Sequence, residues 1–162
     1  MTSLRQHSIL WSKVLIEIRA WCVLFLSIKS LIGHVPSFFG TMLTNVLGEP
    51  LQECGCNPMT GWFVDGFCRS DKSDFGQHIM CCVKTETYLK YSFAQGNNLI
   101  DPIPELDFPG LIAGNHWCLC LKRWQQAWQD GVAPPVILES TDCSALQIIS
   151  ADILYSYQDS TT

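Results

Sequence analysis

The chain has 162 residues, of which 48% are hydrophobic and 15% are charged, so it is long and apolar enough to fold around a core without staples. Its formal net charge is −5, and residues 49–162 carry 6 basic and 14 acidic side chains. An acidic domain without a basic stripe repels a phosphate backbone, which excludes sequence-independent binding of nucleic acid.

Residues 1–44 differ in composition from the rest of the chain. Their only acidic residue is Glu17, and they contain the apolar run Ala20–Ile28. That run is about half as long as a membrane-spanning helix, and no cleavage site of a secretory signal follows it. The composition favours an organelle-targeting segment; the alternatives are a poorly ordered extension, a packed helix and a membrane anchor. We expect an intracellular protein, cytoplasmic or organellar, with membrane contact only through this segment.

The first elements of the predicted domain lie between residues 62 and 96. Trp62–Val64 is predicted to be a short strand that ends at the turn-forming pair Asp65-Gly66. The segment 78–84 is short, apolar and bounded by polar residues, which predicts a buried strand. Thr85 is placed to cap the N-terminus of a helix that ends at Gly96.

The second half begins with a long loop at residues 97–115, and loops of this length are more often functional than connecting. The pattern then predicts a strand at 117–121, a helix at 122–130 and a strand at 136–139. This order has the length of a parallel βαβ unit. Two short helical pieces follow, at 144–149 and 150–157.

These elements predict a single α+β domain over residues 45–157, followed by a tail at 158–162. Its sheet is expected to be small and mixed, with a βαβ unit near 117–140 and two or three short helices.

Nine cysteines are the most informative feature of the chain, and four of them form two pairs of equal spacing, Cys54/Cys56 and Cys118/Cys120. In extended backbone, residues two apart point to the same face, so both sulfurs of a pair can reach one spot. One hypothesis is a tetrahedral zinc site made of these four residues, with Cys68, Cys81 and His78 as reserve ligands. The alternatives are disulfides, which are uncommon in a reducing compartment, and cysteines buried as small hydrophobic residues.

A reactive thiol is a second hypothesis, because a thiolate needs a nearby cation, histidine or helix N-terminus. Cys120 lies at the junction of a predicted strand and helix, and Cys68 directly precedes Arg69. His78 lies on a predicted strand, from which it can reach a cysteine of a neighbouring strand. This pattern predicts a thiol-dependent enzyme or redox protein that uses Cys120 or Cys68 with His78; alternatively, His78 is a hydrogen-bonded structural residue.

Four charged residues are candidates to bind a small ligand: Asp65, Arg69, Arg123 and Glu139. Glu139 follows a predicted parallel strand, and open α/β sheets bind ligands at such strand ends. The alternative for all four is loop capping or surface ion pairing, which contributes little to stability.

Several short motifs together show a family resemblance, and they cover about 110 residues: Asn45-Val-Leu-Gly48, Asp65-Gly66 with Cys68, His78 with Cys81, Gly96-Asn97, Phe108-Pro-Gly-Leu111, Trp117-Cys-Leu-Cys120 and Gly131-Val-Ala-Pro-Pro-Val136. From residue 45 to about 157 the chain resembles the family known as domain of unknown function 2237, a set of small, mainly bacterial proteins. The resemblance leaves the activity open. Val64 and His116 stand where the family usually has arginine, so it implies no anion binding at those two positions.

The leading hypothesis is therefore a small intracellular domain with a cysteine-lined site. We expect that site to bind a metal, with zinc as a candidate, or a small ligand. We also expect Cys56 or Cys68 to lie close to Cys118 or Cys120, beside His78.

Overall fold

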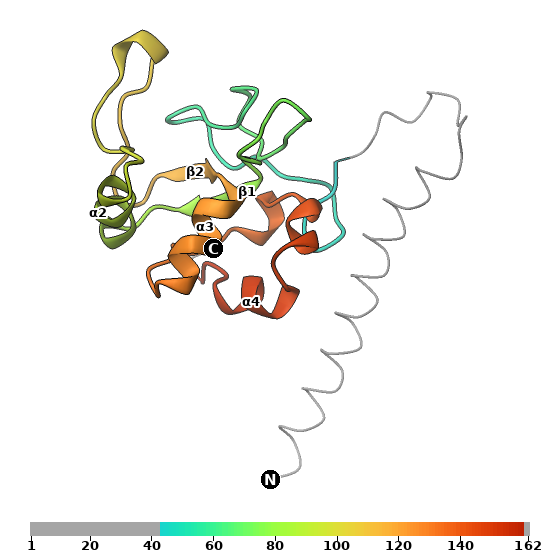
Figure 1. Ribbon diagram of the computed structural model, residues 1–162. Helices are drawn as coiled ribbons and strands as arrows, with labels where there is room; N and C mark the ends of the chain where they lie inside the picture. The colour runs from blue at the N-terminus through green and yellow to red at the C-terminus, as the bar shows by residue number, and fades with distance from the viewer. Residues whose placement is uncertain (1–42, 161–162) are drawn as a thin grey trace.

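The computed structural model describes residues 43–160, and a two-stranded antiparallel sheet lies at the centre of the fold (Figure 1). Strand β1 is Met80–Val83 and strand β2 is His116–Leu119. In their register, Cys81 lies opposite Cys118. Both are short and mainly apolar, and each overlaps a segment where the sequence predicts a strand.

Helix α2 is Glu86–Ala94, helix α3 is Leu121–Gln129 and helix α4 is Ala151–Ser156. The predicted cap of α2 is confirmed, because the Thr85 hydroxyl accepts a hydrogen bond from the backbone N–H of Tyr88 at 3.1 Å. Three short 3₁₀-helices complete the elements: Pro104–Leu106, Leu138–Ser140 and Cys143–Gln147.

The two faces of the sheet pack against different parts of the chain. Helices α3 and α4 lie on one side, and the loops of residues 50–78 lie on the other (Figure 1). The larger apolar cluster includes Met80, Leu119 and the fully buried Trp124, whose indole N–H donates to the Pro134 carbonyl at 3.1 Å. The smaller cluster has a different composition, since it consists mainly of cysteines: Cys54, Cys68, Cys81, Cys118 and Ile137.

The α+β class is confirmed, and the strand–helix–strand order of residues 117–140 is present in modified form. Cys82 on β1 pairs with Trp117 on one side and with Val136 on the other, both antiparallel. Strand β2 and the segment at Val136 therefore run in the same direction, with β1 between them and α3 in the connection. The predicted strand at 136–139 is reduced to bridges at one residue, Val136, because Pro135 has no N–H and Leu138–Ser140 forms a 3₁₀-helix.

The predicted strand at Trp62–Val64 is wrong. The segment forms a turn in which Val64 has a φ of +54°, a left-handed conformation that a strand does not allow. The long loop 97–115 folds back on itself through a bridge between Ile103 and Phe108, and Leu111 enters the core. Phe108 packs against Trp117 at 5.3 Å between ring centroids.

The predictions for the targeting segment lie outside the described residues. Within residues 43–160, no helix has the length and apolar character that crossing a membrane requires.

Candidate functional site, a buried cysteine cluster

Cys81 and Cys118 form the base of the cluster, one on each strand of the sheet. Neither backbone N–H is used between the strands: that of Cys81 donates to the Thr141 hydroxyl at 3.1 Å, and that of Cys118 donates to the Thr60 hydroxyl at 2.8 Å. The two cysteines are therefore a non-hydrogen-bonded pair, the arrangement in which facing side chains lie closest. Both sulfurs are directed to the face of the sheet that the loops cover.

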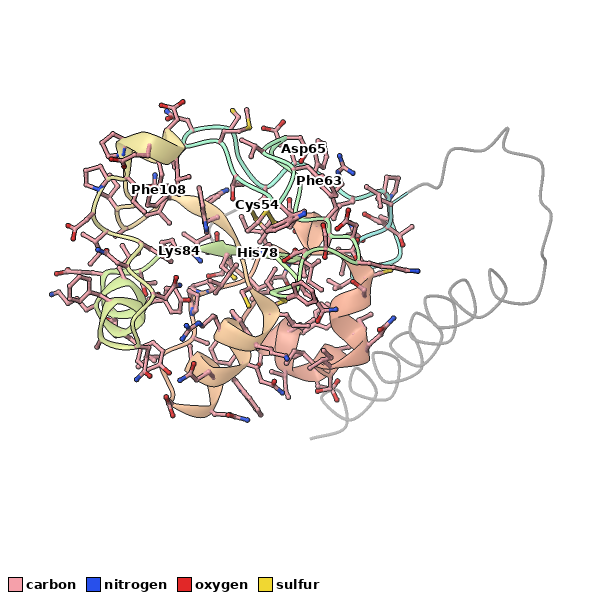
Figure 2. The ribbon with its side chains drawn as sticks, turned by 45° about the horizontal axis from the view of Figure 1, so that its top comes forward. Cys54, Phe63, Asp65, His78, Lys84 and Phe108 are labelled. Carbon is pink, nitrogen blue, oxygen red and sulfur yellow. A yellow bond between two sulfur atoms is a disulfide. The ribbon has the colours of Figure 1, made fainter. Side chains whose placement is uncertain are left out.

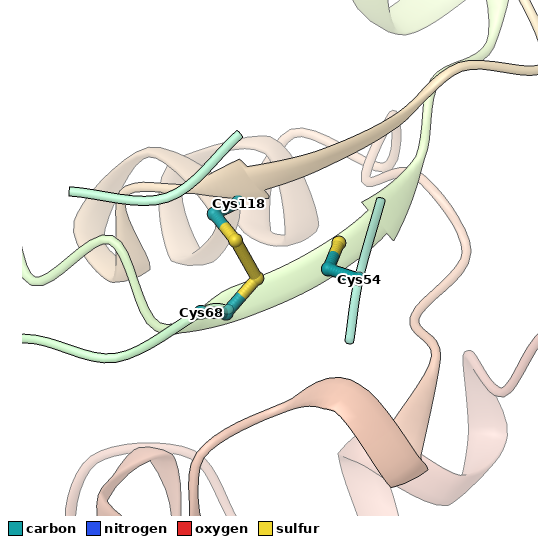
Figure 3. A group of neighbouring side chains, drawn as sticks. All are labelled: Cys54, Cys68 and Cys118. Carbon is teal, nitrogen blue, oxygen red and sulfur yellow. A yellow bond between two sulfur atoms is a disulfide. The ribbon is translucent and has the colours of Figure 1, made fainter. Parts of the chain in front are cut away.

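Two cysteines from the loops complete the cluster. Cys54 is bonded to Cys81 and Cys68 is bonded to Cys118, across Cα–Cα distances of 5.6 and 5.1 Å. The sulfur atoms of Cys54, Cys68 and Cys118 all lie within 4.8 Å of one another, although 50 residues separate the two bonded members of that group (Figure 3). None of the four cysteines is more than 3% exposed.

Backbone contacts hold the two loops over the sheet. The N–H of Cys54 donates to the carbonyl of Gly66 at 2.8 Å, which ties the first loop to the second. Gly66 has a φ of +85°, and a Cβ there would lie 3.0 Å from the Glu53 side chain, so glycine is needed. His116 Nδ1 contacts the Cys54 carbonyl at 3.0 Å, which anchors the loop to β2.

This arrangement supports two chemical states. Oxidised, it contains two adjacent disulfides that staple both loops to the sheet and stabilise the fold by restricting the unfolded chain. Reduced, it presents four thiols at one buried point, and four thiolates are the ligand set of a closed structural zinc site. Burial leaves no open side for a substrate, so neither state is suited to catalysis at the sulfurs.

The structure brings together two of the four cysteines in the sequence-based set of metal ligands. The structure brings Cys54 and Cys118 together, as expected, but Cys56 lies exposed in a turn and Cys120 lies at the N-cap of α3. Strand β2 ends at Leu119, one residue before Cys120, and Cys56 forms a bridge with Met59 across a turn, so neither pair lies within one strand. Cys68 and Cys81 take the other two places, and Cys68 with Cys118 is one of the close pairs that we expected.

Sequence reasoning named Cys68 and Cys81 only as reserve ligands, and it missed Thr60 and Thr141. The threonines carry no signal in the sequence, because their role depends on the loops that cover the sheet.

The same geometry leaves one of the two cysteines of the reactive-thiol hypothesis with a free thiol. Cys68 is held in a disulfide and is fully buried, so it presents no free thiol in this state. Cys120 has a free, partly exposed thiol. His78 contacts a carboxylate, with its Nδ1 2.8 Å from Oδ1 of Asp74.

The four candidate ligand-binding residues do not gather in one place. Asp65 and Arg69 form an ion pair with each other at 2.6 Å. Arg123 lies on α3 and reaches the Gln95 carbonyl at 3.4 Å, whereas Glu139 lies in a 3₁₀-helix. Within the described part of the chain, no ion pair joins Arg123 or Glu139 to the other two.

The fold and the site thus define a class of protein: a small α+β domain with a four-cysteine cluster beneath two loops. The sequence model of the family described as "Uncharacterized protein conserved in bacteria (DUF2237)" matches residues 44–158, and the chain belongs to this family. This confirms the resemblance seen in the sequence. No curated protein matches the chain.

Proposed function

We propose that the chain is a metal-binding domain whose four clustered cysteines, Cys54, Cys68, Cys81 and Cys118, hold a zinc or similar thiophilic ion in the reduced state. The observation that carries this proposal is the grouping of three sulfurs within 4.8 Å, with the fourth bonded to one of them. In tetrahedral zinc sites with Zn–S distances of about 2.3 Å, neighbouring sulfurs lie about 4 Å apart. Opening the two S–S bonds therefore requires only small movements of the side chains.

The chemistry has two balanced steps. Each S–S bond first takes up two electrons and two protons from a dithiol reductant, which is itself oxidised to a disulfide, and yields two thiols. The four thiols then release four protons as they bind Zn²⁺. Because four protein sulfurs fill the coordination shell, the ion has a structural role, joining the loops to β1 and β2.

The proposed compartment and partners follow from this chemistry. An intracellular, reducing environment keeps the cysteines as thiols, which is the state that binds the ion. The ion is the proposed partner, and the net charge of −5 speaks against binding to nucleic acid.

The test is metal analysis of the full chain, purified with a reductant and without chelators. We expect about one equivalent of zinc or another thiophilic ion per chain, and its loss in the Cys118→Ser variant. Cys56→Ser is the matched control, because Cys56 is exposed and lies outside the cluster, and this variant should keep the metal.

A second measurement covers the case in which Cys118→Ser fails to fold. Reduced wild-type protein titrated with Co²⁺ should show the absorption bands of a tetrahedral thiolate site and a protection of four cysteines from alkylation. If the reduced protein binds neither zinc nor Co²⁺, or if alkylation at cell lysis finds all four cysteines already bonded, the cluster is a disulfide staple and the proposal is overturned.

A further inference from the structure

The loop of residues 59–78 holds a histidine whose ring orientation is set by a buried carboxylate. Asp74 is 3% exposed and accepts hydrogen bonds from the backbone N–H of Gly76 at 3.1 Å and of His78 at 2.7 Å. Its Oδ1 also lies 2.8 Å from Nδ1 of His78. Burial raises the pKa of Asp74, but the hydrogen bonds from His78 outweigh burial and lower that pKa overall, so the carboxyl group is ionised.

An ionised carboxylate only accepts hydrogen bonds, so Nδ1 of His78 carries a proton. In the neutral ring, Nε2 is then an unprotonated acceptor. Within residues 43–160, this nitrogen has no hydrogen-bond partner, and the side chain is 35% exposed. The loop thus presents an oriented, accessible proton acceptor.

Neighbouring residues prevent the imidazole from turning. Trp62 stacks on it with ring centroids 5.7 Å apart and an interplanar angle of 11°. Gly76 packs against the ring edge so closely that a Cβ there would lie 2.8 Å from Cε1 of His78. The positions of Asp65, Phe63 and His78 in this part of the molecule are shown in Figure 2. Fixing a reactive group before a ligand binds is typical of functional sites.

The backbone beside this histidine is strained. Gln77 has a φ of +52°, and Val64, a β-branched residue two positions after Trp62, has a φ of +54°. Such conformations are unfavourable for residues other than glycine and cluster at functional sites. Both strained residues adjoin the stacked rings.

The surroundings limit the ligand to an uncharged, apolar molecule. The same loop exposes several large apolar side chains: Phe75 at 92%, Val64 at 68% and Trp62 at 41%. Its one arginine, Arg69, is already bonded to Asp65 and lies 4.2 Å over the Phe63 ring. Lys72 is exposed in the same loop, but Asp65, Asp71 and Asp74 outnumber the two cations, so the loop has no net positive charge to attract an anion.

We propose that the Asp74–His78 pair is a general-base site, at which Nε2 of His78 activates water for the hydrolysis of small, uncharged carboxylic esters. The apolar part of the ester packs against the exposed side chains of Trp62 and Phe75. Asp74 is a positioning residue, which holds the tautomer that leaves Nε2 free and stabilises the imidazolium that forms.

The step balances without any further reactant. Water transfers one proton to Nε2 while its oxygen bonds to the carbonyl carbon of the ester. The bond from that carbon to the alcohol oxygen then breaks, and Nε2 returns its proton to the leaving oxygen. The products are a carboxylic acid and an alcohol, and the imidazole is regenerated.

The test is the release of p-nitrophenol from p-nitrophenyl acetate by the full chain. Every protein carries Cys56→Ser and Cys120→Ser, because these partly or fully exposed thiols also attack this ester. We expect repeated turnover, and a loss of about 10²-fold in rate in His78→Gln, the size typical of a lost general base. Asp74→Asn should give a comparable loss, whereas Asp71→Asn should leave the rate unchanged. Asp71 is the matched control because it is an exposed residue of the same loop that bonds Ser73.

A measurement that needs no change at His78 separates catalysis from a structural role. Nitrogen NMR of the wild type should show, for the neutral ring of His78, an unprotonated Nε2, and Asp74→Asn, whose amide can donate to Nδ1, should show a protonated one. Turnover that is the same in His78→Gln as in the parent, or a His78 that carries its proton on Nε2 in the wild type, would overturn the proposal. Both results are independent of whether the cysteine cluster binds metal.

Discussion

Replacing Lys84 by methionine should stabilise the protein at neutral pH. Lys84 follows β1 and is 1% exposed, and its Nζ has no hydrogen-bond partner within residues 43–160. A favourable contact is made with the ring of Tyr88, whose centroid lies 4.9 Å from Nζ. Methionine has nearly the same length, so it can keep the packing of the aliphatic part while it removes the buried charge.

The magnitude follows from the pKa of the amine. Burial lowers the pKa of Lys84 from 10.5 to about 8, which corresponds to a cost of about 3 kcal/mol for holding the charge in the folded state. The cation–π contact with Tyr88 offsets about 1–2 kcal/mol of this cost. We therefore expect Lys84→Met to raise the free energy of unfolding at pH 7 by about 1–2 kcal/mol.

The sign of the pH dependence is also determined. Below pH 8 both the folded and the unfolded chain carry the charge, and the full cost applies. Between about pH 8 and 10.5 the unfolded chain still binds the proton that the folded chain has released, so the wild type gains stability as the pH rises. The advantage of Lys84→Met should shrink across this interval.

Urea unfolding at pH 7 and at pH 9.5, with the cysteines held in one oxidation state, measures both effects. Lys90→Met is the matched control, since Lys90 is exposed on α2 and forms a surface ion pair with Glu86. It should change the stability by about 0.5 kcal/mol or less. The reasoning is refuted if Lys84→Met is less stable than the wild type at pH 7, or if its advantage is equal at the two pH values.

Three further predictions, which use four substitutions, test the fold. Thr141→Val removes a buried hydroxyl that accepts from the N–H of Cys81, and urea unfolding should show a loss of about 2 kcal/mol; a loss near zero would contradict this role. Thr85→Ala removes the cap of α2 and should cost about 1 kcal/mol by the same assay, with unchanged stability as the contrary result. Gly110→Ala should lower the melting temperature more than Gly96→Ala, although both glycines have positive φ. A Cβ at Gly110 would lie 2.2 Å from the Ile100 carbonyl oxygen, whereas a Cβ at Gly96 would have no atom of the described residues within 4 Å. Equal effects of the two glycine changes would show that the close approach is relieved.

Local structure was predictable wherever a short stretch of sequence decides it. The Thr85 cap, the apolar segments of both strands and the face of α3 that buries Trp124 follow from hydrogen-bonding capacity and periodicity within a few residues. Prediction failed at Trp62–Val64, where apolar residues suggested a strand. Their contacts with distant groups, among them the stack of Trp62 on His78, favour a turn instead.

The sequence by itself determined that this is a small α+β domain of the DUF2237 family, rich in cysteine and acidic overall. Only the tertiary structure decided which cysteines meet. The bonded partners are 27 and 50 residues apart, and they are brought together by the register of β1 with β2 and by the path of two loops. The Cys-x-Cys spacing did not predict the sulfur contacts, because it identifies residues that point to the same face of one strand. The bonded cysteines instead come from different segments, which only the packed fold brings to within bonding distance.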